Sequence, residues 1–331
     1  MPSVDFTESV VEDAALAWLE SLGWTVLHGP DISPDGPSPE RADYREVVLL
    51  PRLSAAVARL NPTASPEAQE EAIRRITHLG APSLMLANRE FHKLLVNGAQ
   101  VDVFRNAEFR GEHIRFLDPD DPANNDWLAA NQFTIVGEDE RRPDVVLFLN
   151  GLPLAVIELK NMADPQATID TAYKQFQTYQ AKIPRLFHYN EVLVISDGAK
   201  AEVGVIEAGR EHVTAWKTID GETVSPSPTL EVAVKGIFDP RRFLDLVRAF
   251  VVFEQDRHGI VKKIARYHQF HAVRKALATA LRASTPNGDR KGGVLWHTQG
   301  SGKSLTMLFF AGKLARHPAM ANPTIVMLTD R

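Results

Sequence analysis

The sequence contains no cysteine, which excludes disulfide bonds and thiolate metal sites. It also lacks any apolar run near the ~20 residues that a membrane-spanning helix requires. Its first residues have neither the basic nor the apolar region of a signal peptide. Positive charge is not in excess, because 37 Lys and Arg face 42 Asp and Glu for a net charge of −5. These absences argue against membrane insertion and a globally basic nucleic-acid binder, and they predict a cytoplasmic protein.

What is present is typical of a globular protein, with 44% hydrophobic and 24% charged residues over 331 positions, enough for roughly two domains. Apolar spacing and capping residues predict helices over residues 7–22, 44–60, 66–79, 164–183 and 238–283. Strands are predicted over residues 25–28, 133–136, 144–149, 154–159, 191–196, 201–205, 293–296 and 324–328, and residues 91–95 and 101–104 are expected to flank a turn at Asn97-Gly98. Residues 31–40 are rich in proline and form a predicted loop, and residues 220–230 are the best linker candidate.

A first group of charged residues lies at the ends of two apolar strands. Asp144 begins one strand, and Glu158 and Lys160 end the next. Residues i and i+2 of a strand point to the same face, so Glu158 and Lys160 can converge on one site. Two carboxylates can hold Mg²⁺, and Lys160 can position water or offset charge on a phosphate. The pattern favours a phosphodiester-cleaving site over a surface hairpin, because charges inside an apolar strand are costly unless they are used.

Two of the predicted helices offer further candidates for this site. Gln175 and Tyr179 are spaced i,i+4 on one helix and can meet the same metal site. Glu8 and Glu12 have the same spacing in the first helix, where either carboxylate could add a metal ligand. For this second pair, we favour a solvated helix face.

The turn between the two strands decides whether the carboxylates can share a metal. A two-residue turn at Asn150-Gly151 is the obvious prediction, and it pairs residues so that Asp144 and Glu158 lie on opposite faces. A one-residue shift in register moves every side chain to the other face. We therefore expect a three- or five-residue loop, or a compensating bulge.

A second motif lies near the C-terminal end, where an apolar segment runs into a loop opened by His297. The loop ends in Gly300, Ser301, Gly302, Lys303 and Ser304. Such loops cradle nucleotide phosphates, with the lysine on the β/γ-phosphates and the serine on Mg²⁺. His297 stands where the general pattern has glycine, which favours a helicase or translocase over a nucleotide kinase or GTPase. Gln269 could read adenine and so select ATP; the alternative is a surface helix residue.

Two further features bear on organisation. Residues 256–275 hold six basic residues against one acidic residue, and we leave open whether they follow a phosphate backbone or form a solvated helix face. Residues 292–331 are too few to complete a nucleotide-binding α/β domain. We therefore expect the chain to be the N-terminal part of a longer protein.

Together these motifs resemble the R subunit of type I restriction enzymes. The resemblance is carried by the segments Leu22-Gly23-Trp24, Arg41-Ala-Asp-Tyr-Arg-Glu46, Arg142-Pro-Asp144, Glu158-Leu-Lys160, Gln175-x-x-x-Tyr179, Lys262-Lys-Ile-Ala-Arg-Tyr-His-Gln269, Trp296-His-Thr-Gln-Gly-Ser-Gly-Lys-Ser304 and Thr329-Asp-Arg331. It implies a PD-(D/E)xK endonuclease domain over residues 1–219, a linker over 220–235, and over 236–331 a helical lead-in to a RecA-like motor domain of helicase superfamily 2.

The resemblance also implies an activity and partners. The family pumps double-stranded DNA with ATP and Mg²⁺, cuts it far from the recognition site, and works with methyltransferase and specificity subunits. Two other hypotheses stay open: a stand-alone nuclease-helicase of DNA repair, and a DNA-binding module whose metal site is vestigial. Neighbouring genes for the partner subunits would distinguish a restriction enzyme from a repair nuclease-helicase. Mg²⁺-dependent nicking by residues 1–235 would test whether the metal site is vestigial.

Overall fold

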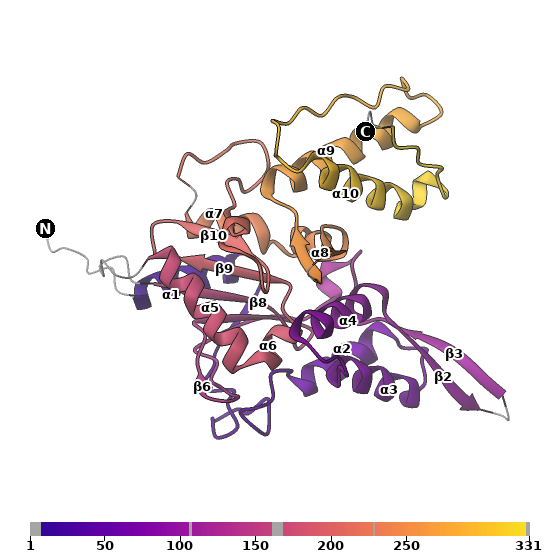
Figure 1. The fold of residues 1–331 in the computed structure, drawn as a ribbon. Helices are drawn as coiled ribbons and strands as arrows, with labels where there is room; N and C mark the ends of the chain where they lie inside the picture. Colours follow the sequence, from indigo (N-terminus) through magenta and orange to yellow (C-terminus); the bar gives the residue numbers. More distant parts are fainter. Residues whose placement is uncertain (1–7, 106–107, 161–167, 228, 258, 329–331) are drawn as a thin grey trace, which may run out of the picture.

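The computed structural model describes residues 8–105, 108–160, 168–227, 229–257 and 259–328 (Figure 1). Its α-helices are α1 (Glu8–Ser21), α2 (Leu50–Leu60), α3 (Pro66–Thr77), α4 (Leu84–Asn97), α5 (Ile169–Lys182), α6 (Pro184–His188), α7 (Leu230–Ile237), α8 (Pro240–Ala249), α9 (Tyr267–Ser284) and α10 (Lys303–Arg316). Its strands are β1 (Thr25–His28), β2 (Ala99–Arg105), β3 (Glu108–Ile114), β4 (Trp127–Asn131), β5 (Ile135–Val136), β6 (Glu140–Arg141), β7 (Val145–Leu149), β8 (Leu152–Leu159), β9 (Val192–Ser196), β10 (Ala201–Gly204), β11 (Thr214–Ala215), β12 (Val251–Gln255) and β13 (Ile260–Ile264).

A seven-stranded mixed sheet organises the first two thirds of the chain. Its order is β1-β4-β7-β8-β9-β10-β11, with β1 parallel to β4, β8 parallel to β9, and the other pairs antiparallel. Every residue of the central strands β7 and β8 is buried, as expected for strands covered on both faces. The predicted α/β fold with a mixed central sheet is therefore confirmed. Among the described helices, none has the length and apolar character needed to cross a bilayer.

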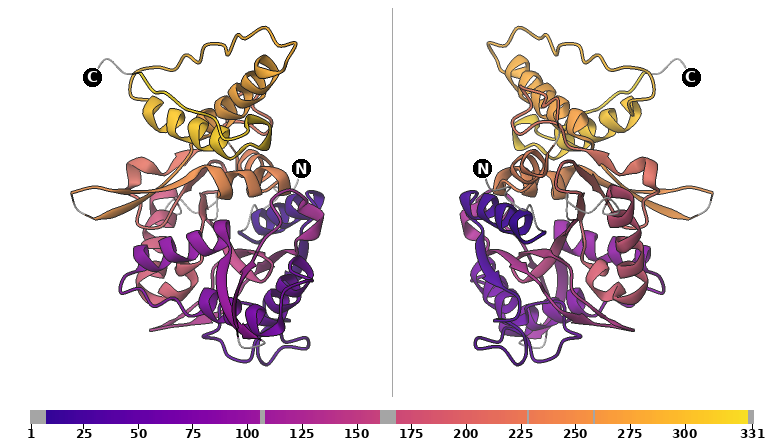
Figure 2. Two further views of the ribbon diagram at one scale, coloured as in Figure 1. Left: turned by 90° about the vertical axis from the view of Figure 1, so that its right-hand side faces the viewer. Right: turned by 90° about the vertical axis from the view of Figure 1, so that its left-hand side faces the viewer.

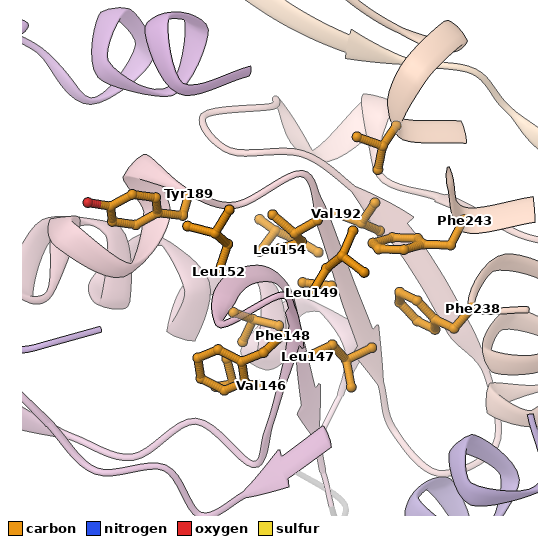
Figure 3. Close-up of a cluster of buried hydrophobic side chains, with 14 of the residues drawn as sticks. Val146, Leu147, Phe148, Leu149, Leu152, Leu154, Tyr189, Val192, Phe238 and Phe243 are labelled. Carbon is orange, nitrogen blue, oxygen red and sulfur yellow. The ribbon is translucent and has the colours of Figure 1, made fainter. Parts of the chain in front are cut away.

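The segment that follows the sheet packs back onto its core. Phe238 and Phe243, which flank the start of α8, point toward Leu149 and Val192 of the sheet (Figure 3). The indole N–H of Trp24 donates to the carbonyl of Phe238 over 2.8 Å. Helix α7 overlaps the predicted linker 220–235 and buries its apolar face. The lead-in to the phosphate loop is thus attached to the sheet through shared aromatic packing.

Several predicted elements agree with the structure. Helix α1 ends just before Gly23 (φ 95°), β1 has the predicted bounds, and α3 begins at the predicted Pro66. Helix α5 ends before Pro184, but its N-cap is Thr168, and the predicted cap at 164–165 lies outside the described residues. Helix α2 begins at Leu50, six residues later than predicted, with Pro51 in its first turn, where the missing N–H of proline costs no helical hydrogen bond.

Other predictions were wrong. Residues 238–283 are not one helical region, since β12 and β13 form a hairpin inside it; the segments Val251-Val-Phe253 and Ile260-Val261 carry β-branched and aromatic side chains that favour strands. The predicted strands 293–296 and 324–328 are irregular and expose Val294 (95%) and Leu328 (91%). In the described part of the chain no strand lies beside them to supply hydrogen bonds. The start of a RecA-like sheet therefore stays a prediction.

Residues 91–95 and 101–104 were expected to flank a turn at Asn97-Gly98, but residues 91–95 belong to helix α4, which ends at Asn97 with Gly98 as its C-cap. Residues 101–104 lie in β2, which pairs instead with β3 in a long hairpin that projects from the body of the molecule (Figure 1). At the far end of the chain, α9 and α10 lie together beyond the sheet (Figure 2).

Within the basic stretch 256–275, Lys262 lies on neither a phosphate-binding nor a solvated face, whereas Arg274 and Lys275 are exposed. Lys262 is buried in β13, and its ammonium donates to Glu191 Oε2 (2.9 Å), Asn88 Oδ1 (2.8 Å) and the Asn190 carbonyl (2.7 Å). The other oxygen of Glu191 lies 3.0 Å from His92 Nδ1. Burial alone would raise the pKa of Glu191, but His92 and Lys262 lower it. We call these five residues the Lys262 cluster; it ties the β12–β13 hairpin to the start of β9.

Candidate active site

The candidate site begins with the hairpin β7–β8, which has a two-residue turn. Asn150 (φ 52°) and Gly151 (φ 79°) both have positive φ, as a type I′ turn requires, and Leu149 pairs with Leu152 across it. A side chain at Gly151 would place its Cβ 2.4 Å from the Leu49 carbonyl oxygen. Only glycine fits both the backbone angle and the close approach of the chain before α2.

A bulge follows the turn and changes the register of the strands. Phe148 pairs with Pro153, whereas Leu147 pairs with Ala155, so Leu154 is an extra residue on β8. Pro153 has no N–H to donate, and proline inside a sheet is found at such irregular positions. The expected compensating bulge is confirmed; the longer loops considered as alternatives do not occur.

The bulge brings the two carboxylates to one face. Beyond it, Val145 pairs with Ile157, and the next residues outward, Asp144 and Glu158, face each other. Asp144 Oδ2 accepts a hydrogen bond from the Leu159 N–H over 2.6 Å, so this carboxylate is turned toward β8. The register required for a shared metal is therefore present.

Lys160 joins the same site. Its ammonium donates to Glu158 Oε1 over 2.7 Å. The Glu158 side chain is 1% exposed and that of Lys160 16%, so the ion pair is largely shielded from solvent. A carboxylate this far from water is costly unless a cation or hydrogen bonds compensate it, and Lys160 supplies that partner.

Gln175 and Tyr179 lie on the face of α5 that meets this site. The Gln175 amide donates to the Tyr179 hydroxyl over 2.6 Å, which confirms that the two side chains share a face. Burial raises the pKa of Tyr179 above its ordinary value, and the charge of Glu158 raises it further. The phenol therefore stays neutral and keeps its proton at physiological pH.

Glu12 was wrongly assigned to a solvated face. It is buried and accepts hydrogen bonds from Asn131 Nδ2 (2.7 Å) and Gln132 Nε2 (2.5 Å). Gln132 has φ 50° and donates its backbone N–H to the Asp144 carbonyl over 2.9 Å. Glu12 thus supports the turn that holds Asp144. The spacing of Glu12 with the apolar residues of α1 could have indicated that Glu12 is buried. The side chain of Glu8 lies outside the described part of the structure.

Some of these side chains line a pocket of about 480 Å³, whereas Lys160 and Tyr179 are not among its lining residues. It is lined by Ser9, Glu12, Gln132, Arg142, Asp144, Glu158 and Gln175. Within the described ranges, no cluster of three or more His, Asp or Glu side chains is placed to hold a metal. The donor set nevertheless fits Mg²⁺, which commonly binds one or two carboxylates and keeps several waters. Asp144 and Glu158 would hold it.

The loop before α10, which the sequence predicts to bind phosphate, has two conformational features that favour anion binding. Gly300 (φ 78°) and Gly302 (φ 79°) have positive φ, and α10 begins directly after them at Lys303. The backbone N–H groups at the start of α10 can therefore face an anion. The Lys303 ammonium donates to the carbonyls of His297 (3.3 Å) and Thr298 (3.1 Å), so it lies folded over the loop.

Gln269 contacts this loop and is buried, so it is not a surface helix residue. Its Nε2 donates to the Gly302 carbonyl over 3.0 Å, and its Oε1 accepts from the Arg266 N–H over 2.9 Å. A Cβ at Gly302 would lie 2.7 Å from Nε2, so glycine lets the amide approach. The structure therefore places Gln269 beside the phosphate loop, with both ends of its side-chain amide hydrogen-bonded to backbone groups of the chain.

Comparison with known proteins gives two family matches. The model described as "Type I restriction enzyme R protein N terminus (HSDR_N)" matches residues 5–212, and the one described as "SWI2/SNF2 ATPase" matches residues 268–331. The first covers the sheet from β1 to β10 and the carboxylate pocket. The second covers α9, the phosphate loop and α10.

Curated relatives match most of the chain. The Type I restriction enzyme HindI endonuclease subunit of Haemophilus influenzae is 40% identical over 331 residues, covering 98% of this chain and 31% of that protein. A protein of Methanocaldococcus jannaschii, provisionally named as the type I restriction enzyme MjaIXP endonuclease subunit, is 30% identical over 348 residues, covering 97% and 32%. The chain therefore spans about a third of the length of these relatives.

Proposed function

Because the chain belongs to the type I restriction enzyme R protein family, we propose that it carries the DNA-cleaving site and the phosphate loop of an ATP-dependent type I site-specific deoxyribonuclease. In this proposal the carboxylate pocket cleaves double-stranded DNA with Mg²⁺. Residues 236–331 begin an ATP-driven translocase of helicase superfamily 2. The assembled enzyme includes methyltransferase and specificity subunits and works in the cytoplasm.

One observation carries the nuclease proposal: the bulge at Leu154 places Asp144 opposite Glu158, with Lys160 hydrogen-bonded to Glu158. A hairpin serving only the core needs no register shift and no buried charges beside its ends. When bound by Asp144 and Glu158, Mg²⁺ would supply a Lewis acid and an acidified water.

The chain's own residues have distinct roles in this site. Lys160 is a fixed cation that offsets negative charge developing on the phosphate. Tyr179 and Gln175 form a neutral hydrogen-bonded pair beside the pocket and can orient a water or a phosphate oxygen without adding charge. Glu12 holds the turn behind Asp144, so we assign it a positioning role.

The motor proposal rests on the phosphate loop. Gly300, Ser301, Gly302 and the start of α10 would cradle the ATP phosphates, with Lys303 on the β/γ-phosphates and Ser304 on Mg²⁺. Lys303 would exchange its two backbone carbonyl contacts for phosphate oxygens. Gln269 is assigned to adenine on the pattern; its contact with Gly302 additionally supports a role in holding the loop.

The two other hypotheses are less well supported. A vestigial metal site has no reason to keep two buried carboxylates and a half-buried lysine in register. A stand-alone repair nuclease would use the same chemistry, and the family match favours the restriction enzyme over it.

The test uses the assembled full-length enzyme. Asp144→Ala, Glu158→Ala and Lys160→Ala should each lower DNA cleavage by at least ~10²-fold, because each removes charge stabilisation at the reacting phosphate. ATP hydrolysis should persist, since the phosphate loop is built from other elements. Asp144→Asn, which keeps an oxygen for the Leu159 N–H, separates loss of chemistry from loss of fold. Asp13→Ala, at an exposed acid of α1, is the matched control.

Loss of ATP hydrolysis together with cleavage in these variants would refute two separate sites. Cleavage at the wild-type rate in Asp144→Asn and Glu158→Ala would refute the metal site itself.

A further inference from the structure

A second pocket lies directly beside the carboxylate pocket. It measures about 530 Å³ and is lined by Glu140, Arg141, Arg142, Thr171, Lys174, Gln175, Thr178 and Tyr179. Arg142 and Gln175 line both pockets, so the two pockets are adjacent and share part of their walls. Any polymer that reaches Asp144 and Glu158 with one of its units can therefore place a neighbouring unit here.

The basic residues of this second pocket differ in their pairing. Arg141 contacts Asp139 over 3.0 Å. Arg142 and Lys174, by contrast, are exposed and form no ion pair with any residue that the structure describes. The charge of these two side chains is thus available to a ligand.

Their positions relative to the carboxylates are fixed by rigid elements. Arg142 precedes Asp144 by two residues at the entry to β7, and Lys174 precedes Gln175 on α5. Both backbones are held by the elements that hold the candidate catalytic groups. Side chains anchored in this way keep a constant offset from the reacting centre, as a substrate-positioning group must.

The chemistry of the two side chains fits phosphate. A guanidinium can bind a phosphate through two parallel N–H bonds, and an ammonium acts as a compact point charge. The pocket offers no stacking platform, since its one aromatic residue, Tyr179, is buried. Because the whole chain carries a net charge of −5, attraction for a polyanion must be local.

We propose that Arg142 and Lys174 bind backbone phosphates of duplex DNA next to the phosphate being cut, and so set the position of the strand over Asp144 and Glu158. This inference rests on the proposed nuclease function and names two of its substrate contacts. Phosphate contacts fix register without reading sequence. The pair would therefore hold DNA of any sequence.

The experiment measures binding of a fluorescent duplex of roughly 20 base pairs to the chain by anisotropy, without Mg²⁺, between about 50 and 200 mM salt. Arg142→Gln and Lys174→Gln should each weaken binding about tenfold near 0.1 M salt. Each should also lower the slope of log affinity against log salt by about 0.9, and the double variant by about twice that. The loss should be equal for two unrelated sequences.

Three controls separate phosphate binding from other effects. Arg142→Lys and Lys174→Arg keep the charge and should keep the slope. Lys93→Gln removes an exposed charge on α4, outside both pockets, and should change neither affinity nor slope. In the assembled enzyme, Lys174→Gln should raise the DNA concentration needed for half-maximal cleavage while ATP hydrolysis persists.

The proposal is overturned if the wild-type chain shows no salt-dependent binding, or if the double variant keeps the wild-type slope. It is also overturned if the loss depends on DNA sequence, which would indicate base contacts. These outcomes differ from failure of the nuclease assignment, which is judged by cleavage in Asp144→Asn.

Discussion

Removing the ammonium of Lys262 tests whether the Lys262 cluster stabilises the fold. The side chains of Lys262 and Glu191 are both 0% exposed. The three N–H groups of Lys262 have three oxygen acceptors at 2.7–2.9 Å, so none of its hydrogen-bonding capacity is left over. Lys262→Ala leaves the Glu191 carboxylate buried, with the His92 ring at 3.0 Å as its remaining side-chain partner in the Lys262 cluster.

The magnitude follows from what is left behind. Breaking one partner of a buried ion pair typically costs about 3–5 kcal/mol, because the other charge stays desolvated. Removing both charges with side chains of similar shape is often neutral. We therefore expect Lys262→Ala to lower the free energy of unfolding by about 3–5 kcal/mol, and Lys262→Met combined with Glu191→Gln to cost far less.

Urea unfolding followed by tryptophan fluorescence measures this. Trp24 and Trp127 are buried in contact with each other, with ring centroids 4.9 Å apart, and report on the sheet core. The urea midpoint should fall in Lys262→Ala with little change in slope. A loss below about 1 kcal/mol, or a double variant as unstable as the single one, would refute the reasoning. Lys263→Ala, which removes an exposed partner of Glu254, is the matched control and should cost less than about 1 kcal/mol.

Two other predictions concern the phosphate loop and acid stability. Lys303→Ala in the assembled enzyme should abolish ATP hydrolysis, and with it the DNA cleavage that depends on translocation. DNA modification by the partner subunits should persist. An unchanged ATPase rate would refute the phosphate-loop assignment. His271 has its pKa lowered from 6.5 to about 4, first by burial and then by Arg274, Arg242 and Lys275. Between these two pH values the unfolded chain binds a proton on His271 that the folded chain does not bind. The contribution of His271 to the free energy of unfolding is therefore present above about pH 6.5 and falls by about 3 kcal/mol as the pH drops toward 4. Urea unfolding at several pH values checks this, since His271→Gln should lose that part of the pH dependence.

The central hairpin was predictable because its signals are local. Asn150-Gly151 determines the turn, and the need for Asp144 and Glu158 to share a face requires a register shift. Pro153 marks where the shift occurs, since a proline in a central strand has no N–H to pair. These residues act within one hairpin, so sequence spacing alone carries the geometry.

The remainder depends on contacts between distant segments. Lys262 lies among basic neighbours in the sequence. Its burial is possible only because Glu191 and Asn88, from distant parts of the chain, accept its hydrogen bonds. Glu12 similarly depends on Asn131 and Gln132. The hairpin β12–β13 was missed because the long helical spacing on either side of it dominated the pattern. From the sequence pattern alone, a charged residue that is buried against a distant partner cannot be distinguished from one that is exposed to solvent.

The extra residue Leu154 makes the hairpin sensitive to whether its length is odd or even. Inserting or deleting one residue between Asp144 and Glu158 would send one carboxylate to the far side of the sheet, even though the core would stay apolar. Changing the length by two residues would keep both on the same side. A single insertion in the turn would keep Asp144 and Glu158 on the same face only if the bulge were lost at the same time. Among natural variants of this hairpin, loop length and bulge should therefore change together.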